Sequence, residues 1–185
     1  MYQLRFLILV GMILAVAASR LIPHPPNFAP IGAMALFGGA CFAVKRVAFL
    51  VPLGAMLVSD LAIGLLSGDL SLGLHALITV VYGSFALIVC LGFWLRGRRK
   101  VVPIAGAALA SSVLFFVLTN FGVWALGSLY PKTWDGLVTC YVAAIPFFHN
   151  TLLGDVVYVT VLFGGLALAE EGFPALREPA VAVSK

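Results

Sequence analysis

The residues Arg20-Leu21-Ile22-Pro23-His24-Pro25-Pro26-Asn27-Phe28-Ala29-Pro30 separate two strongly apolar segments and decide how the chain is arranged. Their four prolines remove backbone donors and fix φ, and each residue before a proline is pushed toward an extended conformation. We therefore expect a stiff, non-helical turn here. Because Arg20, His24 and Asn27 are polar, the turn is either a simple hairpin between two membrane spans or a lid that faces a ligand.

The composition indicates an integral membrane protein. Of the 185 residues, 63% are hydrophobic and only 10% are charged, with a mean hydropathy of +1.14. Soluble domains carry about 25% charged residues. The formal charge of +4 does not imply a nucleic-acid partner, because the basic residues lie in short loops, as membrane topology requires.

Apolar runs predict an all-α, integral membrane bundle of six transmembrane helices. The expected spans are roughly 4–22, 28–44, 47–67, 73–95, 101–129 and 142–169, in a single domain of residues 1–185 with a tail from 170 to 185. The second span is short and glycine-rich, and the sixth is expected to begin around Pro146. We find no internal repeat.

The basic residues predict the orientation. With the N-terminus in the cytoplasm, nine of the eleven Lys and Arg residues fall inside, and only Arg20 and Lys132 fall outside. This predicts a multi-pass protein of the bacterial inner membrane with both termini in the cytoplasm. Residues 1–19 also resemble a secretory signal peptide ending at Ala15-Val16-Ala17, but the apolar run continues to Ile22, so we favour a retained helix.

The sequence offers little for catalysis or metal binding. It contains no HExxH, GxSxG or paired-aspartate phosphate motif, so we expect no enzyme and no catalytic residues. Its three cysteines are far apart, which argues against a zinc or iron–sulfur site and against a disulfide framework. A metal site built from His24, His75, His149 and Asp155 is conceivable, but these residues are scattered, and we expect neither metal nor cofactor.

Polar residues gather in the outer half of the predicted bundle. Ionisable and amide groups within hydrocarbon are costly and usually face a cavity or a partner. Asp60, Asn120 and Asp155 therefore mark either a ligand site or a structural clamp, for which Arg20 is the candidate partner. Asp69 and Lys132 are expected to be merely solvated. Trp124 and other aromatics near Asn120 and Asn150 suggest a small outward-facing cavity.

The blocks from Arg20 to Gly39 and from Thr119 to Asp155 resemble the signatures of a family of small bacterial membrane proteins of unknown function. In architecture the chain is similar to the S components of energy-coupling-factor transporters. That resemblance implies capture of a vitamin-like micronutrient and partnership with a transmembrane coupling protein and ATPases. An alanine-x-x-x-alanine face serves the coupling contact in those proteins; this sequence has Gly11-x-x-x-Ala15 and Ala15-x-x-x-Ser19. A related cobalamin transporter uses a cysteine as cobalt ligand, and Cys140 is the one placed for that role here.

Three hypotheses follow. The first is a membrane subunit that binds or takes up a small polar molecule; the second is a non-transporting scaffold or accessory subunit; the third, least favoured, is an intramembrane enzyme. Besides the lipid bilayer, the first requires a small-molecule ligand. Its predicted binding residues, including those of the lid, are Arg20, His24, Asn27, Asp60, Asn120, Trp124, His149, Asn150 and Asp155.

Overall fold

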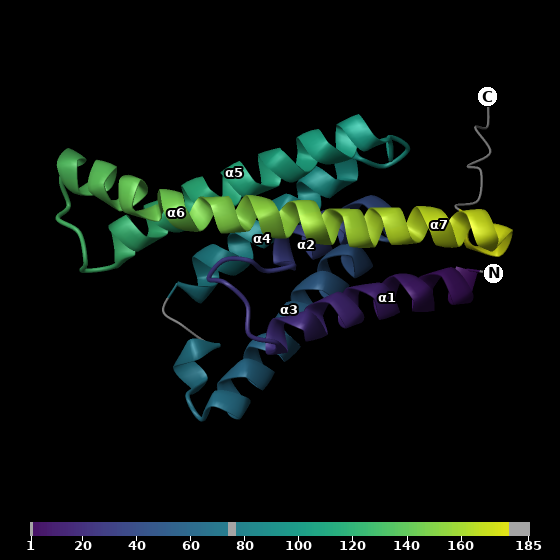
Figure 1. The fold of residues 1–185 in the computed structure, drawn as a ribbon, viewed down its shortest axis with the longest axis horizontal. Coiled ribbons are helices and arrows are strands. Elements are labelled where there is room, and N and C mark those ends of the chain that lie inside the picture. The colour runs from purple at the N-terminus through teal and green to yellow at the C-terminus, as the bar shows by residue number, and fades with distance from the viewer. Residues whose placement is uncertain (1, 74–76, 178–185) are drawn as a thin grey trace.

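The computed structural model describes residues 2–73 and 77–177, and in that part of the chain it contains helices and no strand. In chain order the helices are α1 (Tyr2–Ala18), α2 (Ile31–Cys41), α3 (Lys45–Ser67), α4 (Ile78–Trp94), α5 (Val101–Leu126), α6 (Trp134–Val159) and α7 (Gly165–Gly172). A π-helical turn, Thr160–Gly164, joins α6 to α7, so the two form one continuous rod of 39 residues (Figure 1). The all-α prediction is confirmed.

Four helical stretches are long and apolar enough to cross a membrane: Gln3–Leu21, Lys45–Ser67, Val101–Leu126 and Trp134–Gly172. The remaining two helices, α2 and α4, have only 11 and 17 residues. At 1.5 Å per residue, α2 rises about 16 Å, roughly half of a hydrocarbon core of about 30 Å. The expected six spans therefore become four long helices and two shorter ones.

Two helices differ clearly from the expected boundaries. The segment expected at 28–44 is helical only from Ile31 to Cys41, because Pro30 stands immediately before the first helical residue. The rod expected at 142–169 begins at Trp134, where the Thr133 side chain accepts a hydrogen bond from the Gly136 N–H at 3.2 Å. Pro146 lies inside this helix; a membrane helix tolerates an interior proline when its surroundings satisfy the freed backbone groups.

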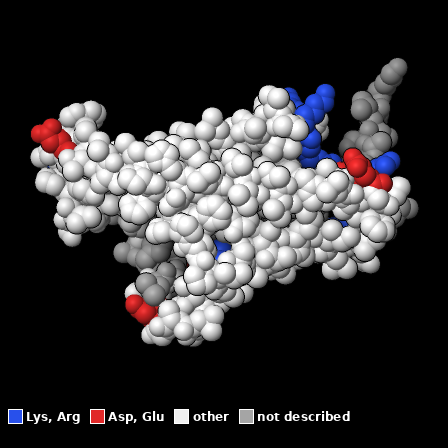
Figure 2. Space-filling view, in the orientation of Figure 1, with Lys and Arg blue, Asp and Glu red and all other residues white. Residues whose placement is uncertain are grey.

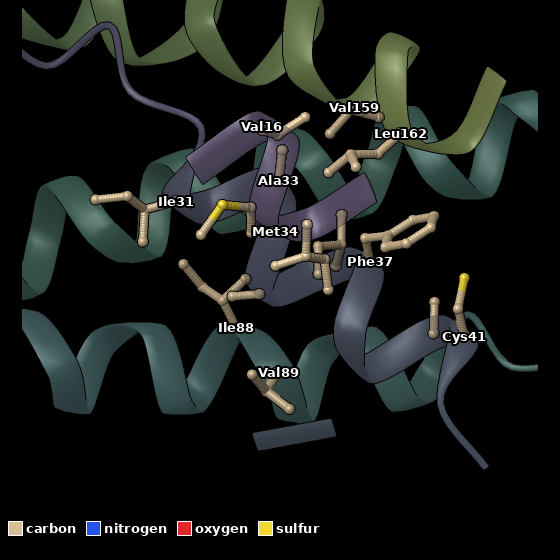
Figure 3. Packing of buried hydrophobic residues seen from close by; sticks show 14 of the residues in the cluster. Val16, Ile31, Ala33, Met34, Phe37, Cys41, Ile88, Val89, Val159 and Leu162 are labelled. Atoms are coloured by element: carbon tan, nitrogen blue, oxygen red, sulfur yellow. The ribbon is translucent and has the colours of Figure 1, made fainter. Parts of the chain in front are cut away.

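Helix α2 forms the centre of the bundle, and every one of its residues except Gly32 is buried. In Figure 3 its side chains, among them Met34 and Phe37, lie among residues of α1, α4 and the α6–α7 rod. A helix that is apolar on all faces is typical of such a buried position. The crossing of α2 with α4 is so close that a Cβ at Gly39 would collide with the Val89 carbonyl, which explains the glycine.

The C-terminal end of α2 is completed by Arg96, which follows α4. Its Nε donates to the Gly39 carbonyl at 3.0 Å and its Nη2 to the Phe42 carbonyl at 2.6 Å. The last carbonyls of a helix have no partner within the helix and carry partial negative charge. A guanidinium there supplies both the missing donors and the complementary charge.

The start of α1 and the end of α7 lie side by side. Glu170 accepts hydrogen bonds from Arg5 at 2.7 Å and from Arg99 at 3.1 Å, which ties α1, the α4–α5 turn and α7 together. Figure 2 shows most of the visible Lys and Arg side chains at this end, a small basic patch near the middle of the molecule, and only acidic groups among the charged side chains visible at the far end. We call the region of Arg5, Arg98, Arg99, Lys100 and Glu170 the basic end.

Candidate functional site

The proline-rich lid runs from Ile22 to Pro30 and is not helical. The expectation of a non-helical stretch is wrong for its first two residues, because Arg20 and Leu21 belong to a 3-10 turn, Ser19–Leu21, that extends α1. The restraint imposed by Pro23 reaches only the residue before it, and Ile22 is indeed extended, with φ −88° and ψ 136°. This places the Arg20 side chain at the end of α1 and the rest of the segment beside α6.

A tight turn in the lid explains one of its polar residues. The Phe28 N–H donates to the Pro25 carbonyl at 3.0 Å, which closes a four-residue turn. Asn27, at the third position, has φ +63°, the left-handed conformation that a type II turn requires there, and Pro26 at the second position supplies the matching fixed φ. Asparagine is among the few non-glycine residues that adopt this conformation readily.

Helix α6 holds the lid in place. The Asn150 amide nitrogen donates to the Pro26 carbonyl at 2.9 Å, and the rings of Phe28 and Tyr158 are 5.7 Å apart. At Gly154 an added Cβ would lie 3.2 Å from the Ala29 nitrogen, so the lid backbone packs directly on the helix. The prolines and these contacts together fix the conformation of the lid.

Asp60, on α3, forms the first of two buried carboxylate sites. Arg20 Nη2 lies 2.6 Å from Asp60 Oδ1, and the Tyr82 hydroxyl donates to Asp60 Oδ2 at 2.8 Å. Arg20 also donates to the Ser59 hydroxyl and, at 3.3 Å, to the Met56 carbonyl. The exposed fractions of the Arg20 and Asp60 side chains are 12% and 6%, so this is a largely buried ion pair. Arg20 is thus the partner of Asp60, as the sequence suggested.

Asp155, near the middle of the α6–α7 rod, is held by a different arrangement. The Ser112 hydroxyl donates to Asp155 Oδ2 at 2.6 Å, and the Ala33 backbone N–H donates to the same carboxylate. A Cβ at Gly32 would lie 2.7 Å from Asp155 Oδ1, so the carboxylate sits against the first turn of α2. The free N–H groups and partial positive charge of a helix N-terminus stabilise a carboxylate in this position.

Both carboxylates line one cavity of about 430 Å³ beneath the lid, on the side of the molecule away from the basic end. Its walls combine polar side chains from five segments with a cluster of phenylalanines. Among these, Phe85 and Phe115 stack with ring centroids 4.8 Å apart, and Phe116 and Phe148 are also 4.8 Å apart. A mostly apolar, aromatic cavity with a few convergent polar groups is typical of a small-molecule site.

Six of the nine predicted binding residues line the cavity: Arg20, His24, Asn27, Asp60, Asn120 and Asp155. The other three lie outside its lining. Trp124 donates its Nε1–H to the Pro131 carbonyl at 2.9 Å and organises the α5–α6 turn. His149 is on the exposed face of α6, and Asn150 contacts the lid backbone rather than the cavity. Whether the six bind a ligand stays a prediction.

Several lining residues were missed from the sequence although their spacing carries a signal. On α5 the lining face repeats at helical intervals through Ser111, Phe115 and Thr119, ending beside Asn120. On α6 the same holds for Ala144, Phe148, Thr151 and Asp155. Extending each helix face by three or four residues from a predicted polar residue would have found most of these positions. Tyr82, which binds Asp60, had no such signal.

Asp69 and Lys132 remain outside the cavity. Hydrogen bonds from the side chain and backbone of Ser71 lower the pKa of Asp69 below its ordinary value, as expected for an exposed turn aspartate. Lys132 donates to the Trp124 and Gly127 carbonyls at the end of α5. Within residues 2–73 and 77–177, no three His, Cys, Asp or Glu side chains are grouped to hold a metal ion; His75 lies outside the described residues.

The fold and composition define a small, all-helical membrane protein with a cavity among its helices. A family model matches residues 2–176, and the chain belongs to that family, a family of unknown function (DUF6580). Comparison with curated proteins and with solved structures gave no match.

Proposed function

We propose that this protein is a membrane subunit that binds a small polar molecule from the outer face and serves its uptake. The observation that carries the proposal is the cavity of about 430 Å³, which joins two buried carboxylates, an amide and a phenylalanine cluster beneath a rigid lid. Ligand sites of this kind occupy about 300–1,000 Å³. The carboxylates and Asn120 would orient polar groups of the ligand, and the phenylalanines would pack against its ring.

The lid supports this proposal through its rigidity. Ordering a flexible segment on binding subtracts from affinity, at about 0.5–1.5 kcal/mol for each immobilised side chain. Here four prolines, the Asn27 turn and the Asn150 contact fix the segment in advance. Arg20, which anchors the start of the lid to Asp60, would link the lid's position to the charge in the cavity.

The same subunit would act with a transmembrane coupling protein and ATPases, in the manner of the S components that the architecture resembles. On α1, Gly11 and Ala15 are exposed, and a Cβ at Gly11 would meet nothing within 4 Å, so this face is not used for packing inside the subunit. Small residues allow close helix contact. Ser19 does not join that face, because its hydroxyl donates to Tyr158 at 3.0 Å.

The test uses protein purified in mild detergent and mass spectrometry of the small molecules and subunits that accompany it. Val123→Trp, which fills the cavity, is compared with Val113→Trp on the exposed face of the same helix. We expect a nearly stoichiometric compound with the wild type and with Val113→Trp, and its loss with Val123→Trp. Identical small-molecule content in all three folded proteins would refute the binding site.

One observation favours a second candidate, a scaffold without a ligand. The charges and hydrogen-bonding groups around Asp60 already have partners within the protein, which is what a structural clamp requires. The side chains of this group are Arg20, Ser59, Asp60 and Tyr82. The scaffold predicts that a variant with an apolar pair in place of Arg20 and Asp60 keeps both its stability and its partners. The uptake subunit predicts that this variant remains folded but loses its small molecule.

A further inference from the structure

A second hollow lies on the side of the bundle, between α5 and the α6–α7 rod, with a volume of about 450 Å³. Most of its lining side chains are apolar, including Ile104, Leu109, Val156 and Phe163. The π-helical turn supplies part of its wall through Thr160, Phe163 and Gly164. Such turns inside α-helices are frequent at functional sites. We call this hollow the lateral groove.

The length of the lateral groove matches one membrane leaflet. Along α5 its lining runs from Arg99 and Val101 to Ser112. The eleven steps from Val101 to Ser112 rise about 16 Å, close to half of a hydrocarbon core of about 30 Å. The deep end closes on Ser112 and Asp155, which are 1% and 4% exposed. A membrane helix of a partner protein needs the whole thickness, whereas one acyl chain needs a single leaflet.

Positive charge stands at the mouth of the lateral groove. Arg99 lines it, and Lys100, next to it, is exposed at the start of α5 (the basic residues at this end are blue in Figure 2). Glu170 accepts hydrogen bonds from both Arg99 and Arg5, so two guanidinium groups lie close together at this end. Arg5 Nη2 is buried without a hydrogen-bond partner among the described residues. The first turn of α5 contains no acidic residue, and its N-terminus favours a nearby anion.

We propose that the lateral groove binds one anionic phospholipid of the leaflet at the basic end. One acyl chain lies between α5 and the α6–α7 rod, and the phosphate group faces Arg99 and Lys100. The shape selects a single chain, and the charge selects an anionic headgroup over a zwitterionic one. The lipid therefore fastens α5 to the rod. This inference is independent of the ligand of the cavity beneath the lid.

The experiment is native mass spectrometry of the full chain in detergent, titrated with dioleoylphosphatidylglycerol or with dioleoylphosphatidylcholine, which has the same chains. We expect one tightly held phosphatidylglycerol, preferred over phosphatidylcholine on the order of tenfold, since two basic residues face the headgroup. Equal retention of the two lipids by the wild type would overturn the proposal, because it would indicate only general lipid contact.

Two variants with matched controls locate the site. Ala105→Trp fills the groove, and Ala110→Trp places the same ring on an exposed position of α5 outside it. Arg99→Gln/Lys100→Gln removes the charge at the mouth, and Lys45→Gln/Arg46→Gln removes as much charge at the exposed start of α3. We expect Ala105→Trp to lose the tight lipid, the Arg99/Lys100 pair to lose the headgroup preference, and both controls to behave as the wild type. Equal losses in variants and controls would refute the groove as the site.

Discussion

The two buried carboxylates of the cavity differ in what balances their charge. Asp60 meets a formally charged side chain, Arg20, at 2.6 Å. Asp155 meets fixed donors, the Ser112 hydroxyl at 2.6 Å and the first turn of α2. Arg20 stands two residues before the lid, so its ion pair joins the start of the lid to α3, whereas the Ala33 N–H belongs to the central helix α2. We infer that Asp60 couples the lid to the cavity and that Asp155 holds the centre of the bundle together.

The largest effect on stability is expected from removing the Asp60 carboxylate. Asp60→Leu leaves the largely buried Arg20 guanidinium without its counter-charge, which should lower the free energy of unfolding by about 3–5 kcal/mol. Adding Arg20→Met should restore most of that loss, because replacing a buried ion pair with apolar residues is often neutral. Thermal unfolding in detergent measures both variants. A double variant as unstable as Asp60→Leu would mean that the pair is not an independent clamp.

A smaller effect is expected at Asp155. Ser112→Ala removes a charge-assisted hydrogen bond to the carboxylate and should cost about 1.5–3 kcal/mol. The neighbouring Ser111→Ala is a matched control, because the Ser111 hydroxyl donates only to the Ala107 carbonyl of its own helix among the contacts resolved here, at 2.8 Å. The same unfolding measurement should therefore separate the two serines. If Ser111→Ala is equally destabilising, the contribution of Asp155 to the core has been overestimated.

The smallest effect concerns the lid turn. Asn27→Gly keeps the positive φ of this position and should change stability little, whereas Asn27→Ala should cost about 1–2 kcal/mol. Both variants remove the amide that lines the cavity. The two variants should therefore differ in stability, but both should lose the bound small molecule. Retention of the small molecule by the stable Asn27→Gly variant would show that the amide contributes only to the turn.

Much of this architecture could be predicted from the sequence, and the failures have physical causes. Long apolar runs identified the helices, and the scarcity of charged residues made Arg20 the natural partner of Asp60. The second span was predicted to be short, but both of its ends were placed too far out, because apolar residues continue past them and hydropathy alone does not mark them. The early start of α6 was missed because a proline commonly marks a helix end, whereas Pro146 lies inside this helix, which begins at the Thr133 cap.

The site was predicted less completely than the fold. A membrane position and a polar side chain were enough to select Asp60, Asn120 and Asp155, since such residues rarely face lipid. The same two features do not predict whether Trp124 and His149 face the cavity, because aromatic and imidazole side chains near the membrane interface also contact loops or solvent. The contact of Asp155 with the first turn of α2 depends on helix packing across more than a hundred residues, which no local pattern encodes.

The two ends of α2 also bear on how the protein is made. The segment leaves the ribosome as 11 apolar residues, too short to cross the bilayer alone. Its terminal carbonyls have no donor until Arg96, 57 residues beyond Gly39, has been synthesised. The Ala33 N–H in its first turn has no carboxylate partner until Asp155, which is synthesised later still. A nascent chain halted before α6 therefore holds an incomplete central helix. The last long helix to be inserted is the one that makes the first short helix a stable part of the membrane protein.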